Sequence, residues 1–190
     1  MSKKMQRSLL LLIVAVIGAL TSAQAVQYAS APAAQINSST GISSSQWYPV
    51  KKVIDGDTID ISIGASTTRV RLIGLDTPEV VDPRKPVQCF GKEASDEAKK
   101  ILTGQSVRLE TDPTQSLYDK YGRLLAYVYA PSNANPDGVL FNEFMISEGY
   151  GHEYTYDVPY KYQKEFKAAE KSAREAGKGL WAPGACAGQS

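Results

Sequence analysis

Residues 48–75 hold three strand-like segments with almost nothing between them, which leaves no room for intervening helices. Residues 58–63 carry isoleucine at every second position, a period of two that is typical of a half-buried strand. The segment 48–54 precedes this strand, and residues 68–75 follow it after the turn Gly64-Ala65-Ser66. Because connections this short join antiparallel neighbours, the region predicts a three-stranded meander.

The remaining elements follow in an order that few folds satisfy. Helical patterns cover residues 90–104, 137–149 and 159–176, and strand patterns cover residues 106–111 and 123–130. A five-stranded, partly open barrel with three helices packed on it accommodates this order. We therefore expect an α+β domain with the OB-fold, a fold that by itself does not determine function.

A secretory signal is predicted at the N-terminus. Three basic residues within the first seven positions precede the apolar run Leu9–Leu20, and Ala23-Gln24-Ala25 follows it. This is the order of a signal peptide, residues 1–25, removed after Ala25. The alternative is an uncleaved membrane anchor, but a helix of that run rises only about 18 Å against a hydrocarbon core of ~30 Å. We expect a mature protein that is secreted, or retained in the periplasm or at the cell surface, with no membrane segment.

The mature chain divides into an arm and one domain. Residues 26–45 are rich in Ser, Ala and Gln without periodicity, a composition that predicts a flexible arm. Residues 46–186 are enough for a single domain with its own core.

The charge of the mature chain excludes a protein that coats nucleic acid by bulk electrostatics. The sequence has 21 Lys plus Arg and 20 Asp plus Glu, and the signal carries three of the basic residues and no acidic one. The mature net charge is therefore −2, whereas a non-specific nucleic-acid coat is clearly basic. Any binding of nucleic acid must depend on a local cluster.

Two cysteines, Cys89 and Cys186, suit an exported chain, in which an even count favours a disulfide. Two unpaired thiols are the alternative. A Cys/His metal site is not expected, because His152 is the one histidine in the sequence, and we expect a surface position for it.

The densest group of acidic residues lies around the second and third predicted strands. Asp57 precedes the second strand, Asp76 ends the third, and Glu79 lies just beyond. In a meander these ends can lie side by side, and three close carboxylates require a compensating cation. Oxygen ligands and flexible geometry favour Ca²⁺, with Mg²⁺ second. Arg71 is not needed for a metal, but its guanidinium fits an anionic phosphate substrate.

A second basic cluster, Asp119-Lys120-Tyr121-Gly122-Arg123, leads into the fifth predicted strand. Arg123 could hold a phosphoryl group from the side opposite the first arginine. Lys120, Tyr121, Tyr154 and Tyr156 could bind a terminal phosphate and stack a base. Each motif alone has an ordinary structural explanation, such as a turn, a helix cap or an edge residue. The combination is what favours a site.

Taken together, these motifs resemble the staphylococcal nuclease (thermonuclease) family. They stand in the family's order and approximate spacing over residues 47–183. The matching segments are 54–58, 71–79, 90–94, 119–128, 142–143 and 179–181.

The resemblance implies an OB-fold nuclease that uses Ca²⁺. Asp57 and Asp76 would bind the metal through their carboxylates, and Thr77 through its backbone carbonyl. Glu79 would position or deprotonate the attacking water.

For the reaction, the resemblance implies that Arg71 and Arg123 hold the scissile phosphate. Water would attack in line and the 5′-oxygen would leave, giving 3′-phosphate ends. The expected partners are single-stranded and double-stranded DNA and RNA, bound by a monomer without an obligate protein partner.

A non-catalytic OB-fold module that binds oligonucleotides or a protein is the competing hypothesis. Three carboxylates facing an anion would weaken such binding, so their joint presence favours the nuclease. A calcium-binding adhesion domain is a third reading, but it leaves Arg71 and Arg123 without a role.

Overall fold

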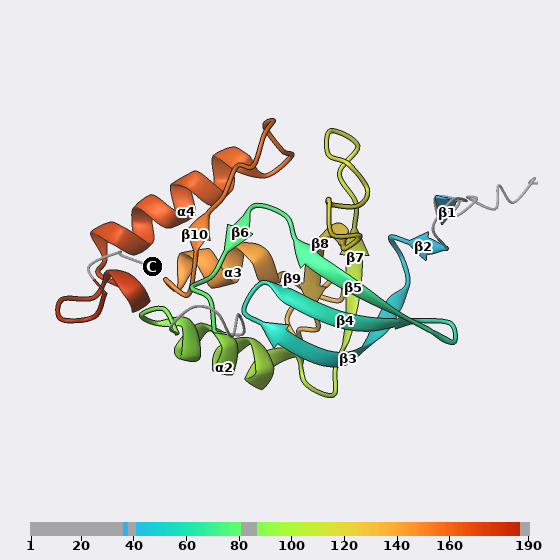
Figure 1. Cartoon of the computed structure of the whole chain (residues 1–190), viewed down its shortest axis with the longest axis horizontal. Helices are drawn as coiled ribbons and strands as arrows, with labels where there is room; N and C mark the ends of the chain where they lie inside the picture. The colour runs from blue at the N-terminus through green and yellow to red at the C-terminus, as the bar shows by residue number, and fades with distance from the viewer. Residues whose placement is uncertain (1–35, 38–40, 81–86, 187–190) are drawn as a thin grey trace, which may run out of the picture. The chain divides into compact units, whose positions relative to one another are not determined.

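The computed structural model describes residues 36–37, 41–80 and 87–186, all within one compact unit, residues 34–190 (Figure 1). The predicted signal peptide, residues 1–25, lies outside the described residues. At the end of the predicted arm, β1 (Ile36–Asn37) pairs with β2 (Ile42–Ser43). In the part of the chain that is described, no helix is long and apolar enough to cross a membrane.

Five strands close into a barrel. They are β3 (Trp47–Asp55), β4 (Thr58–Ile63), β5 (Ser66–Leu72), β7 (Ser106–Glu110) and β8 (Leu124–Ala130). The sheet runs in the order β5-β4-β3-β7-β8, and a parallel pairing of β5 with β8 closes it. All the other pairs in the barrel are antiparallel. The expected α+β architecture with an OB-fold barrel is confirmed, and the barrel is closed where we expected it to be partly open.

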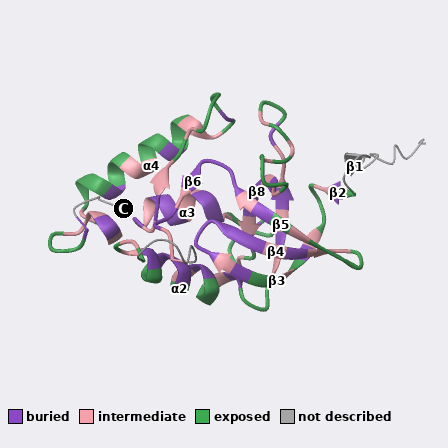
Figure 2. Ribbon diagram, in the orientation of Figure 1, coloured by how far each residue is buried: buried purple, intermediate pink, exposed green. Residues whose placement is uncertain are grey.

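The barrel interior explains the alternation in the sequence. In β4, Ile59 and Ile61 point into the core and are buried, and Val70 and Leu72 of β5 do the same. Each of these strands contributes one buried apolar face to the core (Figure 2). Burial on one face only fixes the register, because a shift by one residue would turn the isoleucines outward.

Three helices pack around the barrel, as predicted. They are α2 (Gly91–Leu102), α3 (Phe141–Ser147) and α4 (Gln163–Glu175), followed by a 3₁₀ turn, η1 (Gly179–Trp181). Helix α2 packs against β3, whereas α3 lies between β8 and α4 (Figure 1). Helices α2 and α4 bury one face and expose the other, whereas every residue of α3 is buried or half-buried (Figure 2).

The third strand ends earlier than expected. We predicted a strand over residues 68–75, but β5 stops at Leu72 and the chain turns at Gly74, where φ is +74°. A Cβ at Gly74 would lie 2.7 Å from the Tyr160 ring and 2.8 Å from Phe166, so the turn needs glycine. After it, β6 (Leu75–Asp76) runs as a separate strand.

Two helices start later than expected, each by four residues. Where we predicted a helix from residue 137, Gly138 makes a turn at φ +85° and β9 (Val139–Leu140) pairs with β8. The last helix was expected from residue 159 but begins at Gln163; before it, Tyr160 is buried in the core and the Lys161 amide donates to Asp112.

A pairing between distant segments builds one side of the site. β10 (His152–Glu153) pairs antiparallel with β6, so that His152 faces Asp76 along the ladder. The Tyr154 amide continues this ladder with a hydrogen bond to the Gly74 carbonyl, at 3.1 Å. Residues that follow β10 are thereby fixed beside the end of β5.

A buried carboxylate anchors the segment between β10 and α4. Asp112 accepts hydrogen bonds from the Tyr127 hydroxyl at 2.7 Å and from the Lys161 amide at 2.8 Å. Burial opposes its ionisation, but these bonds and those from Thr114 outweigh the burial and lower the pKa of Asp112. The barrel and this segment are therefore joined by a charge-assisted network.

Candidate active site

Two carboxylates converge on one arginine at the end of the barrel. Asp57 comes from the turn between β3 and β4, Asp76 from β6, and Arg71 from β5. The Arg71 Nη2 atom lies 2.7 Å from Asp76 Oδ1 and 3.3 Å from Asp57 Oδ2. Asp57, Asp76 and Arg71 therefore lie together, as expected, although Asp57 and Asp76 are 19 residues apart in the sequence.

The local sequence fixes how Asp57 is oriented. Its Oδ2 accepts from the Thr77 amide at 3.0 Å and the Thr77 hydroxyl at 3.2 Å, and its Oδ1 accepts from the Thr58 hydroxyl at 2.8 Å. A Cβ at Gly56 would lie 2.7 Å from Thr77 Cγ2, so the Asp-Gly-Asp turn can approach Thr77 only with glycine in the middle. This contact joins the first turn of the meander to the chain after β6.

Excess negative charge characterises this end of the barrel. Burial raises the pKa of Asp55 to about 7, with a further contribution from the charge of Asp57, against hydrogen bonds from Gly56 and Val80. Burial also raises the pKa of Asp76, and the charges of Asp57 and Glu79 add to this against the attraction of Arg71. Burial is the main cause of both shifts, and the neighbouring carboxylates add to it.

The chemistry of these oxygens fits a hard divalent cation. Asp57 and Asp76 face one point, and half of the Asp76 side chain remains exposed. Carboxylate and carbonyl oxygens are the ligands that Ca²⁺ takes, often with water completing the shell. No group of three or more His, Cys, Asp or Glu side chains in the described residues forms a ready metal cage. The fit therefore rests on two carboxylates together with backbone and water oxygens.

Glu79 lies beside these carboxylates but not in the lining of the adjacent pocket. Its charge raises the pKa of both Asp55 and Asp76, which places it within electrostatic reach of the two. Its backbone amide donates to the Gln88 side-chain oxygen.

Arg123 is held by the turn that precedes β8. Asp119 Oδ1 accepts from the Tyr121 and Arg123 amides, both at 2.9 Å, and Asp119 Oδ2 accepts from Arg123 Nε at 2.6 Å. Burial opposes ionisation of Asp119, but the bonds from Arg123 and Tyr121 prevail and lower its pKa. Among the described residues the two Nη groups of Arg123 make no hydrogen bond, and they lie at the pocket.

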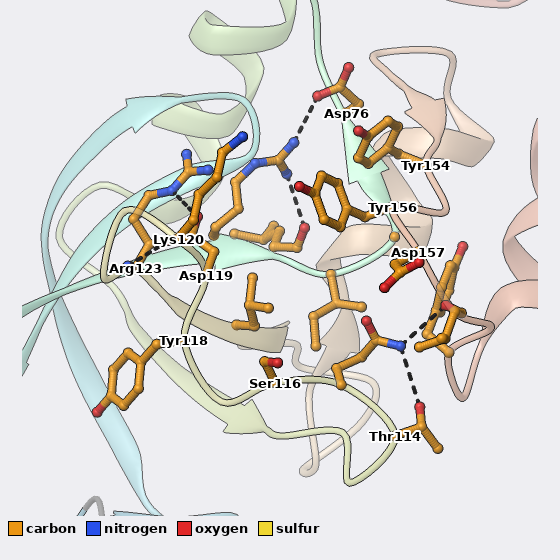
Figure 3. Close-up of a pocket in the computed structure, with 18 of the residues that line it drawn as sticks. Asp76, Thr114, Ser116, Tyr118, Asp119, Lys120, Arg123, Tyr154, Tyr156 and Asp157 are labelled. Atoms are coloured by element: carbon orange, nitrogen blue, oxygen red, sulfur yellow. Dashed lines mark hydrogen bonds and ion pairs between the residues drawn. The ribbon is translucent and has the colours of Figure 1, made fainter.

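A cavity of about 510 Å³ joins the two arginines to a set of aromatic residues. Figure 3 shows Lys120 and Arg123 on one side, Tyr154 and Tyr156 on the other, and Asp76 at the top of the view. Tyr121 and Tyr156 are 72% and 71% exposed, so their rings are available to a ligand. The structure thus brings together the substrate-binding candidates Lys120, Tyr121, Tyr154 and Tyr156 with Arg71 and Arg123.

The expectation for His152 was wrong. Its side chain is only 20% exposed, with Nδ1 3.4 Å from Glu170 Oε1 and the ring edge-on to Trp181 at 5.0 Å. Both partners come from the C-terminal part of the chain, which sequence spacing alone could not place beside β10.

Three supporting residues were missed by the sequence reasoning. Asp55 accepts from the Gly56 and Val80 amides and so ties the first turn to the chain after Glu79. Asp119 orients Arg123, and its spacing of four residues before an arginine was the available signal. Gln88, which contacts the Glu79 backbone, carried no signal in the sequence.

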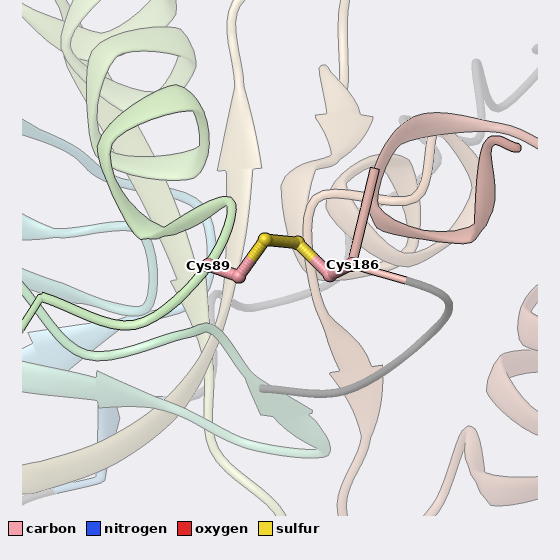
Figure 4. The surroundings of a disulfide bond; sticks show 2 residues. All are labelled: Cys89 and Cys186. Atoms are coloured by element: carbon pink, nitrogen blue, oxygen red, sulfur yellow. A yellow bond between two sulfur atoms is a disulfide. The ribbon is translucent and has the colours of Figure 1, made fainter. Parts of the chain in front are cut away.

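The predicted disulfide is present between Cys89 and Cys186, with a Cα–Cα distance of 5.7 Å (Figure 4). It joins Cys89, two residues before α2, to the turn after η1. Cys89 is exposed, whereas Cys186 is buried.

Comparison with known proteins agrees with this arrangement. The profile of the family described as staphylococcal nuclease homologue matches residues 69–183, more than half of the chain. The chain belongs to the staphylococcal nuclease family. The match begins in β5 and ends after η1, so it contains every candidate site residue except Asp57.

Three relatives match a larger share of the chain than the family profile does. A thermonuclease of Staphylococcus hyicus is 43% identical over 145 residues, 75% of this chain and 81% of the relative. A thermonuclease of Staphylococcus intermedius is 39% identical over 179 residues, 94% of this chain and 98% of the relative. The SPbeta prophage-derived endonuclease YokF of Bacillus subtilis is 35% identical over 131 residues, 68% of this chain and 42% of the relative.

Proposed function

We propose that the protein is an exported, Ca²⁺-dependent nuclease that hydrolyses DNA and RNA and leaves 3′-phosphate ends. One observation carries the proposal. Asp57 and Asp76 converge on Arg71, and Arg71 and Asp76 line a pocket together with Arg123 and exposed tyrosines. A site with anionic and cationic halves fits a metal-assisted reaction of a phosphodiester, and the family relationship supports this chemistry.

The metal would be held by the carboxylates of Asp57 and Asp76 and the backbone carbonyl of Thr77. Bound there, Ca²⁺ would supply Lewis-acid polarisation of a phosphoryl oxygen. Arg71 donates a hydrogen bond to Asp76 and forms an ion pair with Asp57 in this structure, so it would turn toward the phosphate once the metal neutralises the two carboxylates. Its fork then offers the bidentate geometry that phosphate oxygens prefer.

Arg123 would bind the same phosphate from the other side. Arg123 Nε donates a hydrogen bond to Asp119, and this contact holds the two Nη groups of Arg123 in position before the substrate binds. Charge that is fixed in advance stabilises the added negative charge of the transition state without reorganisation. Glu79 would position the attacking water or take its proton; the water oxygen bonds to phosphorus, the bond to the 5′-oxygen breaks, and that oxygen takes up a proton.

The exposed rings would bind the nucleotide. Tyr154 and Tyr156 lie with their centroids 6.3 Å apart and offer faces on which a base can stack, while Lys120 and Tyr121 would contact a neighbouring phosphate. Stacking is tolerant of sequence and of sugar, so both single-stranded DNA and RNA are accommodated. We propose that double-stranded DNA is cut where it opens, and that the protein acts as a monomer.

The disulfide supports an exported location, because such bonds persist in oxidising compartments. We propose that the signal peptide is removed and that the mature enzyme is secreted or retained at the cell surface or in the periplasm, without a membrane segment.

Product analysis tests the proposal. A 5′-labelled single-stranded oligonucleotide digested in Ca²⁺ should give fragments whose new 3′ ends carry phosphate, because the 5′-oxygen is the leaving group. Treatment with a 3′-phosphatase should then slow their migration on a denaturing gel. Fragments with 3′-hydroxyl ends would contradict the proposed direction of cleavage, and an uncut oligonucleotide that still binds would favour the non-catalytic module.

A further inference from the structure

The backbone of Glu79 is clamped at two points by one residue. The Glu79 amide donates to Gln88 Oε1 at 2.5 Å, and the Glu79 carbonyl accepts from the Gln88 amide at 2.9 Å. Such a pair fixes both the position and the rotation of the Glu79 peptide units. Gln88 is not among the residues that line the pocket, and its two hydrogen bonds to Glu79 act on the backbone of that residue.

The residues on either side of Glu79 are also confined. The Val80 amide approaches Asp55 Oδ2 at 3.4 Å. From the other side, a Cβ at Gly91 would lie 2.6 Å from Val80 Cγ1 and 2.9 Å from the Pro78 carbonyl oxygen. Residues 78–80 are thus enclosed between the end of β3 and the start of α2.

The start of α2 is itself held by the disulfide. Cys89 follows Gln88 directly and is bonded to Cys186. The next residue, Phe90, adopts φ +66°, a conformation that is rare for a large side chain and persists only where neighbouring contacts impose it. Its ring packs on Tyr150 at 5.9 Å between centroids. The disulfide bond to Cys186 helps to impose this conformation on Phe90, because it anchors Cys89, the residue between Gln88 and Phe90.

We propose that Gln88 is a positioning residue for Glu79 and that the Cys89–Cys186 disulfide keeps Gln88 in place, so that full activity requires the oxidised protein. This inference rests on the proposed function, in which Glu79 acts on the attacking water. A dithiol reductant would break the S–S bond: each sulfur takes up one electron and one proton, and the dithiol is oxidised to its own disulfide. The exposed side of Cys89 gives the reductant access.

The consequence is a nuclease whose activity depends on its compartment. Before export, in a reducing cytoplasm, the chain would lack the bond and hold Glu79 loosely. After export, oxidation would complete the clamp. The organism's own nucleic acids would thereby be exposed only to the weaker form.

Steady-state kinetics on single-stranded DNA test the role of Gln88. Gln88→Met keeps the length of the side chain but removes the strong acceptor, whereas Gln88→Glu keeps an acceptor for the Glu79 amide. We expect Gln88→Met to lower kcat roughly 10–100-fold, the scale of a small misplacement of a reacting group, with KM within about twofold of wild type. Gln88→Glu should recover most of kcat. Gln105→Leu, an exposed glutamine beyond α2, is the control and should match wild type.

A reductant tests the link to the disulfide. Dithiothreitol should lower kcat of the wild type by a similar factor, and Cys186→Ser should behave as the reduced wild type does. In Gln88→Met the reductant should have little further effect, because the two changes act on one contact. Circular dichroism of each sample gives the folded fraction, and kcat is expressed per folded molecule.

Three results would overturn the inference: an unchanged kcat in Gln88→Met, a loss of kcat that merely follows the folded fraction, or effects of Gln88→Met and reduction that multiply independently. An oxidised wild type that fails to cleave DNA at all would instead overturn the proposed function, so the two failures are distinguishable.

Discussion

Replacing Glu79 with glutamine should lower kcat by roughly 10²–10⁴, the usual contribution of a positioned acid–base group. The substitution keeps the size of the side chain and its backbone clamp by Gln88 but removes the carboxylate that would orient or deprotonate the attacking water. Binding of substrate depends on other residues, so KM should change little. Initial rates on single-stranded DNA in saturating Ca²⁺ provide the measurement.

The control for this variant is Glu93→Gln, which removes the same charge from the exposed first turn of α2. It should retain wild-type kcat. If Glu79→Gln kept more than about a tenth of wild-type kcat, the carboxylate would have no acid–base role and the placement of Glu79 beside Asp76 would be structural.

Replacing Arg123 with alanine should lower kcat by about 10²–10³, the cost of removing one preorganised donor from a developing anion. We expect the loss mainly in kcat, because the Arg123 guanidinium binds the phosphate most strongly in the transition state, when the phosphate carries additional negative charge. Arg123→Lys should recover only part of it, since an ammonium group cannot reproduce the guanidinium fork that Asp119 orients.

Arg69→Ala is the matched control for this prediction. Arg69 lies on β5 two residues before Arg71, is half-exposed, and pairs with Asp60 outside the pocket. Its loss should leave kcat and KM near wild type. Equal effects of Arg69→Ala and Arg123→Ala would mean that general positive charge, and not a directed contact, drives the reaction.

Local patterning was sufficient to predict most of the fold. The period-two isoleucines of β4 and the closely spaced strands around them required a meander, and the closed barrel contains this meander as three of its five strands. The ends of elements were harder to predict, because distant residues set them. Gly74 breaks the third strand since Tyr160 and Phe166, more than 80 positions later, pack against it.

Some contacts of the candidate site could likewise be predicted from the sequence, and others could not. Arg71 lies on β5 of the meander, Asp57 lies in the turn before β4, and Asp76 follows β5 after a short turn, so their meeting follows from the order of these segments. The environment of His152 could not be predicted, because Glu170 and Trp181 reach it from the last helix and the turn after it. The contact between Gln88 and Glu79 was equally invisible, since a single glutamine has no periodicity or motif to mark it.

The most direct test of the central claim is hydrolysis of single-stranded DNA by the chain from Val26 onward, with Ca²⁺ and with EGTA. Release of acid-soluble fragments should be rapid in Ca²⁺, should stop in EGTA, and should return when excess Ca²⁺ is added. A rate that is the same in both solutions, or no cleavage by the folded protein in either, would contradict a metal-dependent nuclease centred on Asp57 and Asp76.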